Sequence, residues 1–194
     1  MDLDAQRAEL TRLGYAIVSQ DDREIVATRS AWYPDAIATR LRSVVFVRPV
    51  TVLDMSIVTR DRARMLAEAR ELLPSVLPRW LQKSRAVVAV YLADVVDPEA
   101  RAFCVSPQAL GPFESLFYAA ALDRSSGASY YWQGAPLWGG VYFSKLRFLV
   151  RRLTGPTAEP AREPVSVFGV VMTVVVALLL LQAIVAFVYL AVRG

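Results

Sequence analysis

The chain of 194 residues has no histidine and one cysteine, Cys104. The lack of histidine removes the commonest general base, the commonest transition-metal ligand and every Ser-His or Cys-His dyad. One cysteine cannot form an intramolecular disulfide, so we expect Cys104 to be a buried apolar residue in a reducing compartment. The net charge is only +4 and nearly all of the positive side chains are arginine, which gives no support to nucleic-acid binding.

The first third of the chain predicts a helix followed by three strands. Residues 4–13 have the spacing of an amphipathic helix. Two β-rich runs at 15–20 and 23–30 are separated by polar turn residues and predict a hairpin. A third strand is predicted at 43–50, and Pro49 should mark its end because proline cannot donate a ladder hydrogen bond.

The middle of the chain predicts the clearest helix and a buried strand. Apolar residues recur at helical spacing over 60–73, with Thr59 at the start of the helix. Residues 75–83 predict a short irregular helix with Trp80 in the core. The run 85–93 is almost uninterrupted in its apolar character, which is typical of a strand covered on both faces.

The last third of the soluble part predicts a short helix and a second hairpin. Asp97 should cap a helix at 98–103. Strands at 115–123 and 128–133 surround Gly127, which supplies the backbone freedom of the turn. Taken in order, the elements predict an α+β single domain with a mixed or antiparallel sheet.

A tryptophan-rich turn, WQGAPLWGG (132–140), precedes a basic amphipathic stretch at 142–153. Trp132 and Trp138 are expected to pack against the core rather than to bind a ligand. The stretch has Phe143, Leu146, Val150 and Leu153 on one stripe. We predict that its basic residues contact anionic headgroups at a membrane surface; these are Lys145, Arg147, Arg151 and Arg152. The alternative is a plain core helix with a solvated basic face.

The 28 residues from Val165 to Val192 carry no charge. As a helix they would be about 42 Å long, more than the roughly 30 Å of a bilayer core, so they predict one C-terminal transmembrane helix. No signal peptide is evident and only two residues follow the run, which predicts a tail anchor. Basic residues concentrate before the run, so the positive-inside rule predicts a cytoplasmic amino-terminal domain in a single-pass membrane protein.

This gives three segments: a cytoplasmic α+β domain at 1–153, a proline-rich linker at 154–164 and the anchor at 165–192. Within the anchor, small residues recur every four positions and a glutamine lies at membrane depth, a pattern that favours self-association and a homo-oligomer. These anchor residues are Gly169, Thr173, Ala177 and Gln182.

The element order over residues 4–93 resembles the core of restriction-endonuclease-like nucleases. In that family a carboxylate on the second strand and an acid-x-Lys pair on the third hold Mg²⁺ against the scissile phosphate. The third strand here reads VVFVRPV and has neither a carboxylate nor a lysine. Three acidic residues remain at the turn before the second strand, where acids are common turn formers; these are Asp21, Asp22 and Glu24.

A second acidic group, Asp94, Asp97 and Glu99, is interpreted as helix capping. No glycine-rich phosphate-binding spacing is present. The sequence therefore predicts no catalytic residue, no cofactor site and no metal site.

We predict a non-enzymatic interaction or scaffolding module at a membrane, whose partners are the lipid bilayer and a protein that the sequence does not identify. The alternative is a membrane-tethered enzyme with a restriction-endonuclease-like core, intact or degenerate, that acts on nucleic acid or a phosphorylated substrate. Convergence of three acidic side chains in one cleft would favour the enzyme, and their dispersal would favour the module.

Overall fold

The computed structural model describes residues 3–21, 23–33, 39–73, 85–107, 116–134, 140–155 and residue 182. Residues Met1–Pro160 belong to one compact unit. Its elements are, in chain order, α1 (Leu3–Arg12), β1 (Ala16–Gln20), β2 (Ile25–Tyr33), β3 (Thr39–Leu53), α2 (Met55–Leu72), β4 (Arg85–Val96), α3 (Pro98–Val105), β5 (Leu116–Asp123), β6 (Ala128–Tyr131) and α4 (Gly140–Thr154).

The strands form one six-stranded mixed sheet in the order β1-β2-β3-β4-β5-β6. The first three strands and the last pair are antiparallel. The pairs β3–β4 and β4–β5 are parallel, because α2 and α3 carry the chain back between them as crossover connections. The α+β domain with a mixed sheet, expected from the sequence, is confirmed.

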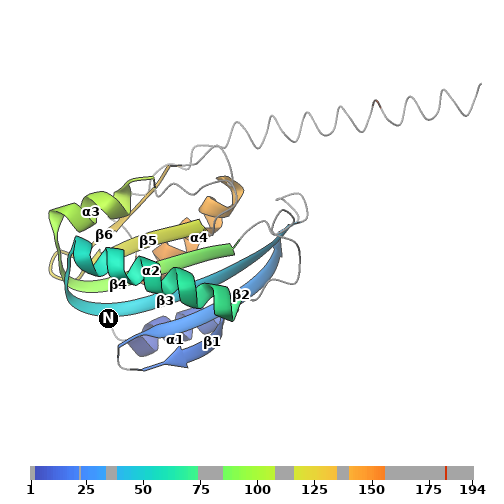
Figure 1. Cartoon of the computed structure of the whole chain (residues 1–194), viewed down its shortest axis with the longest axis horizontal. Coiled ribbons are helices and arrows are strands. Elements are labelled where there is room, and N and C mark those ends of the chain that lie inside the picture. The colour runs from blue at the N-terminus through green and yellow to red at the C-terminus, as the bar shows by residue number, and fades with distance from the viewer. Residues whose placement is uncertain are drawn as a thin grey trace, which may run out of the picture. The chain divides into compact units, whose positions relative to one another are not determined.

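The helices lie on both faces of the sheet (Figure 1). α1 and α4 contact each other and one face, whereas α2 and α3 contact each other and the opposite face. Each face has its own apolar cluster. Strand β4 contributes to both clusters, and every residue from Ala86 to Ala93 is fully buried, as the uninterrupted apolar run predicted.

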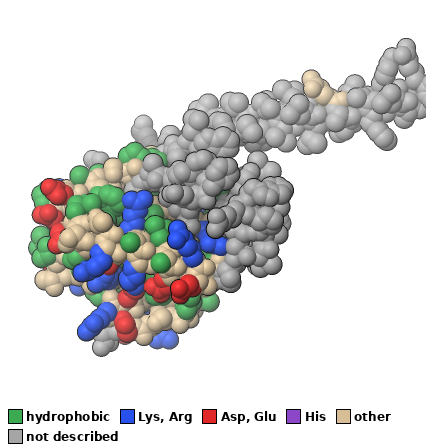
Figure 2. Space-filling view, in the orientation of Figure 1, with side chains coloured by type: hydrophobic (Ala, Val, Ile, Leu, Met, Phe, Trp, Pro, Cys, Tyr) green, Lys and Arg blue, Asp and Glu red, His purple; other side chains and the backbone are tan. Residues whose placement is uncertain are grey.

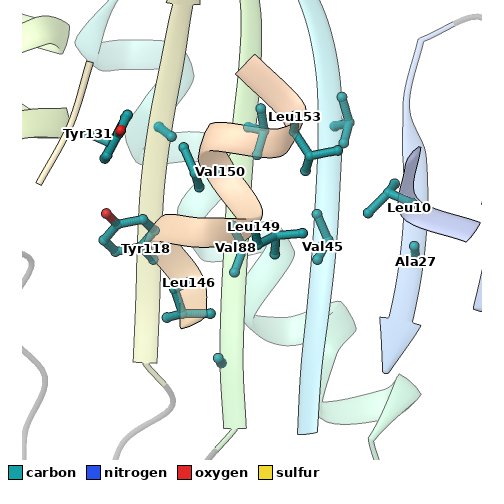
Figure 3. Close-up of a cluster of buried hydrophobic side chains, with 14 of the residues drawn as sticks. Leu10, Ala27, Val45, Val88, Tyr118, Tyr131, Leu146, Leu149, Val150 and Leu153 are labelled. Carbon is teal, nitrogen blue, oxygen red and sulfur yellow. The ribbon is translucent and has the colours of Figure 1, made fainter. Parts of the chain in front are cut away.

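One apolar stripe of α4 packs against the sheet and determines the position of the helix (Figure 3). Leu146, Leu149, Val150 and Leu153 point toward the strands, among Val45, Val88, Tyr118 and Tyr131. All four are at most 4% exposed, as their spacing of three or four residues requires. The helix ends at Thr154, and Gly155 follows with a φ of 82°, the left-handed conformation that glycine adopts after a helix.

Strand β3 is longer than the sequence predicted, because Pro49 does not end it. Pro49 pairs with Leu92 of β4 within the ladder. Strand β2 begins at Ile25 opposite Val47, so beyond Val47 one side of β3 has no partner strand among the described residues. A proline is tolerated at such a free edge because no N–H is needed there.

Helix α2 begins at Met55, before the predicted start at Thr59. Asp54 is the N-cap: its carboxylate accepts hydrogen bonds from the Ile57 amide at 2.8 Å and the Ser56 hydroxyl at 2.6 Å. The signal for this cap is present in the sequence as an Asp followed two residues later by a serine, and it places the helix start before Thr59.

The predicted linker and transmembrane anchor lie outside the described residues, apart from the linker's first two residues and Gln182, which is helical and exposed. Gly169, Thr173 and Ala177 are therefore not described, nor is the predicted irregular helix at 75–83. In the part of the chain that is described, no helix is both long enough and apolar enough to span a membrane.

Candidate functional site

The outer face of α4 is the surface on which the sequence placed a membrane contact. Opposite its buried stripe the helix exposes Lys145, Phe148, Arg151 and Arg152, which we call the α4 surface. Phe148 is 56% exposed, the largest exposed fraction among the bulky apolar side chains that the structure exposes. A phenylalanine surrounded by basic side chains combines an apolar group with positive charge in one patch.

Phe148 was missed by the sequence reasoning, although its position contained a signal. It follows the buried Leu146 by two residues, and two residues of an α-helix correspond to a rotation of about 200°, which turns the side chain away from the core. An aromatic residue at that offset, next to basic residues, indicates an apolar group on the solvent face.

The four predicted headgroup contacts are not equivalent. Arg147 is turned toward the domain, where its guanidinium donates to the backbone carbonyls of Gln133 at 2.8 Å and Gly134 at 3.0 Å. Arg147 therefore holds the segment after β6 against α4. Because its guanidinium is bonded to these carbonyls, Arg147 is less available to a lipid headgroup than the prediction assumed.

Arg152 connects the two helices on this face. Its guanidinium donates to the Glu9 carboxylate of α1 at 2.6 Å, and Glu9 also accepts from Arg12. Arg151 and Lys145 are exposed, and Arg151 makes no ion pair with any residue that the structure describes. The positive charge most available to an external anion is therefore that of Arg151.

The tryptophan-rich turn packs as expected where it is described. The Trp132 ring lies edge-on to Phe143, with centroids 4.9 Å apart, and the Trp132 carbonyl accepts a hydrogen bond from the Tyr118 hydroxyl at 2.5 Å. A Cβ on Gly134 would come within 2.7 Å of the indole, so this close approach requires glycine. Trp138 and residues 135–139 lie outside the described chain.

The opposite face, under α2, contains two carboxylates that are paired with arginines, Glu24 and Asp61. Figure 2 shows basic side chains over this face with acidic ones between and beside them. Glu24, at the start of β2, pairs with Arg64 of α2 at 2.5 Å. Asp61 is 1% exposed and accepts both bonds from the guanidinium of Arg48 on β3. Each carboxylate is neutralised by an arginine, which leaves little negative charge for a metal ion.

The remaining acidic residues have local roles or none. Asp21 accepts bonds from the amides of Arg23 and Glu24 and shapes the β1–β2 turn, as predicted for a turn former; Asp22 is not described. Asp94 lies 3.5 Å from Arg124. Asp97 occupies the N-cap position of α3, but its side chain makes no capping bond there, so the capping prediction is only half right. Glu99 lies exposed in the first turn of α3.

The acidic groups stay apart. Among the residues with described positions, no three His, Cys, Asp or Glu side chains are close enough together to hold a metal ion. Cys104 lies on the buried side of α3, and burial raises the pKa of its thiol to about 12, so it has little of the thiolate character that a nucleophile requires.

Neither protein-family models nor curated proteins match this chain.

Proposed function

We propose that this chain is a membrane-anchored interaction module. In this proposal residues 165–192 span the bilayer, the domain lies on the cytoplasmic side, and the α4 surface rests on anionic headgroups. The observation that carries the proposal is the exposed Phe148 beside Arg151 on the last helix before the linker.

The linker keeps the domain close to the bilayer. Between Thr154 and Val165 there are ten residues, and a fully extended chain of that length reaches no more than about 35 Å. A domain held within that distance meets the surface repeatedly. Even a weak preference of one face then determines its orientation, as expected for an intramolecular encounter.

The charges on α4 are sufficient for such a preference. Each Lys or Arg near an anionic surface contributes about 1 kcal/mol. Lys145 and Arg151 are exposed on this surface, and Phe148 can insert its ring among the headgroups. The contact should weaken with added salt because exposed charges are screened over about 10 Å at 0.1 M.

The arrangement of the carboxylates supports a module over an enzyme. Glu24 and Asp61 are each bound by an arginine, whereas Asp94 and Asp97 lie at the C-terminal end of β4, with Asp97 at the N-cap position of α3. We accordingly expect no Mg²⁺- or Mn²⁺-dependent cleavage of DNA or RNA by the purified protein. Cleavage that Glu24→Gln abolishes would favour the membrane-tethered enzyme instead.

Vesicle sedimentation of a chain that ends at Pro160 tests the proposal. The truncated protein should leave the membrane fraction, and its near-ultraviolet circular dichroism should show a packed domain. At low salt it should bind vesicles with anionic lipid and not neutral ones, and Phe148→Ser or Arg151→Glu should weaken that binding at least about fivefold.

Arg60→Glu is the matched control, because Arg60 is 67% exposed on α2, on the other face of the sheet. It should weaken binding much less than Arg151→Glu. Equal loss in both variants would indicate a general charge effect, and equal binding of both vesicle types would contradict a seating role for α4.

A further inference from the structure

Helix α1 and the α4 surface share one side chain, Arg152. The Nε–H of Arg152 donates to Oε1 of Glu9 on α1 at 2.6 Å. Both side chains are partly exposed, Arg152 at 43% and Glu9 at 17%, so solvent reaches the ion pair. Arg152 therefore has two roles: it ties α1 to α4, and it is one of the basic side chains around Phe148.

Glu9 does not depend on Arg152 for its charge balance. Its two carboxylate oxygens also accept from Nε and Nη2 of Arg12, each at 2.8 Å, within α1 itself. When Arg152 leaves, Glu9 keeps this bidentate partner three residues along the helix. The interhelical pair can thus open without leaving an unpaired carboxylate, which is the step that makes the loss of an ion pair costly.

Apart from this pair, few contacts hold α1 in place. Of its ten residues, Gln6 and Leu10 are the two that are buried. Leu10 belongs to the apolar cluster that contains Ala27 and Val45 (Figure 3). Both amide atoms of Gln6 are buried without a hydrogen-bond partner among the described residues, so the burial of Gln6 opposes docking. Because a helix of ten residues is marginal in water by itself, α1 should unfold when it detaches.

The segment that can detach ends at Gly14. Gly14 has a φ of 79°, and the Tyr15 amide donates back to the Leu10 carbonyl at 2.9 Å, which closes the helix. Tyr15 is buried, and its hydroxyl accepts a hydrogen bond from Ser43 of β3. The chain is therefore fixed to the sheet from Tyr15 onward.

We infer that contact with an anionic membrane releases α1 from the domain: headgroups that bind Arg152 break its pair with Glu9, and residues 3–13 then detach. An ion pair between partly exposed side chains is weak, and an anionic surface attracts each basic side chain with comparable strength. Headgroups that meet Arg151 and Phe148 thus compete with Glu9 for the neighbouring guanidinium. The inference rests on the proposed function, because it requires the α4 surface to meet lipid.

The coupling between α1 and the lipid must act in both directions. If lipid binding favours the detached state, docked α1 weakens lipid binding by the same factor. Docked α1 therefore restrains the α4 surface, and its release supplies one more guanidinium to the headgroups. Release also uncovers apolar side chains of the sheet, such as Ala27 and Val45, so the domain exposes this surface chiefly at the membrane.

Hydrogen exchange of the full chain in nanodiscs tests the inference. One set of discs contains phosphatidylcholine alone, and the other contains phosphatidylcholine with phosphatidylglycerol. Protection of the α1 amides should be at least about threefold lower in the anionic discs, because they lose the ion pair that opposes local opening. The amides of α2, on the other face of the sheet, are the internal reference and should exchange equally in both sets.

Two substitutions remove one arginine each from the same carboxylate. Arg152→Gln removes the interhelical bond, so α1 protection should already be at least about threefold lower in neutral discs and should fall no further in anionic ones. Arg12→Gln is the matched control, because it keeps the bond between Glu9 and Arg152. In neutral discs its α1 protection should stay within about twofold of the wild type, and it should still fall in anionic discs.

Several outcomes would overturn the inference. Equal α1 protection in the two sets of discs would do so, as would a lipid response that persists in Arg152→Gln. Equal losses in Arg12→Gln and Arg152→Gln would reduce the effect to net charge, and an equal fall in α2 would mean that anionic lipid loosens the whole domain.

The vesicle experiment with Arg151→Glu tests the α4 contact separately. If vesicles show that contact while α1 stays protected in anionic discs, the release of α1 alone is wrong. If vesicles show no preference for anionic lipid, the proposed function itself has failed.

Discussion

The two helical layers of this domain treat charge in opposite ways. On the α2 face, arginines are tied into the structure: Arg48 binds the buried Asp61, and Arg62, Arg64 and Arg101 lie over the rings of Phe117, Phe46 and Tyr130 at 5.0 to 5.8 Å. On the α4 face, Lys145, Arg151 and Arg152 are exposed around Phe148, and Arg147 is turned toward the domain. Arg152 is held there by the Glu9 carboxylate of α1.

The difference indicates what each face can do. A charge locked in a buried pair or over a ring supports the fold and is not available to a partner. An exposed charge contributes little to stability and much to association with an oppositely charged surface. Substitutions on the α2 face should therefore change stability first, and substitutions on the α4 face should change binding first.

The largest effect is expected from the buried ion pair. Arg48→Met removes the guanidinium that donates to both oxygens of the Asp61 carboxylate, which leaves the ion pair with Arg60 at 3.8 Å as the one remaining among the described residues. The free energy of unfolding should fall by about 3 kcal/mol, since removing one member strands a buried charge. Urea unfolding of the full chain in detergent measures it.

The double substitution Arg48→Met with Asp61→Leu is the control. It removes both charges, so stability should return to within about 1 kcal/mol of the wild type. A double variant as unstable as the single one would mean that the pair itself, rather than the stranded charge, determines stability.

The next prediction concerns buried polar groups on the two faces, whose replacement should raise the free energy of unfolding instead of lowering it. Both amide atoms of Gln6, on the α4 side, and the hydroxyl of Tyr91, on the α2 side, are buried and make no hydrogen bond to described residues. Burial also raises the pKa of Tyr91. Gln6→Met should stabilise the fold by about 1–2 kcal/mol and Tyr91→Phe by about 1 kcal/mol.

Thermal unfolding of the two variants checks this expectation. A loss of stability in Gln6→Met would show that the amide has a partner, such as a bound water, which methionine cannot replace. Leu10→Met, one helical turn further along α1 and also buried, controls for the change in side-chain shape.

The fold was predictable from local patterns, and the exceptions have local causes. The order of elements, the double coverage of β4 and the stripe of α4 followed from periodicity, which reports burial directly. The position at which β3 ends could not be predicted from periodicity. Whether Pro49 is tolerated depends on where β2 begins, and that is set by pairing with residues far along the chain.

The surfaces were less predictable than the fold. The sequence located the basic helix but grouped Arg147 with Arg151, because composition cannot show that Arg147 turns toward two backbone carbonyls.

Removing the N-cap side chains of α2 and α3 should have smaller effects on stability, and the two effects should differ. Asp54 accepts two hydrogen bonds, whereas the side chain of Asp97 makes no capping bond. Asp54→Ala should therefore lower the thermal midpoint by a few degrees. Asp97→Ala should stay within about 0.5 kcal/mol of the wild type.

The pH dependence of the Asp54 effect gives a further check. The hydrogen bonds from the Ser56 side chain and the Ile57 amide lower the pKa of Asp54 below its ordinary value of 3.8. A carboxylate whose pKa is lowered in the folded state adds stability at pH values above its ordinary pKa. This added stability is lost as the pH falls through the folded-state pKa. The gap between wild type and Asp54→Ala should therefore narrow in acid, and a constant gap would contradict the cap.

The smallest effect on stability, and the clearest test of the two faces, concerns the neighbours Arg151 and Arg152. Arg152 is 43% exposed and bound to Glu9, so Arg152→Gln should cost less than about 1 kcal/mol, and 0.5 M salt should remove most of the difference. Arg151→Gln should leave stability unchanged, because Arg151 pairs with no described residue.

For binding to anionic vesicles, the order of the two variants should be reversed, with the larger loss in Arg151→Gln. The Arg151 guanidinium is free to meet a headgroup, whereas that of Arg152 must first release Glu9. Arg151→Gln should thus weaken binding more than Arg152→Gln, although the two remove the same charge from adjacent positions. If binding fell equally in both, net charge alone would account for the attraction. The specific geometry of α4, with Phe148 beside Arg151, would then have no part in orienting the domain.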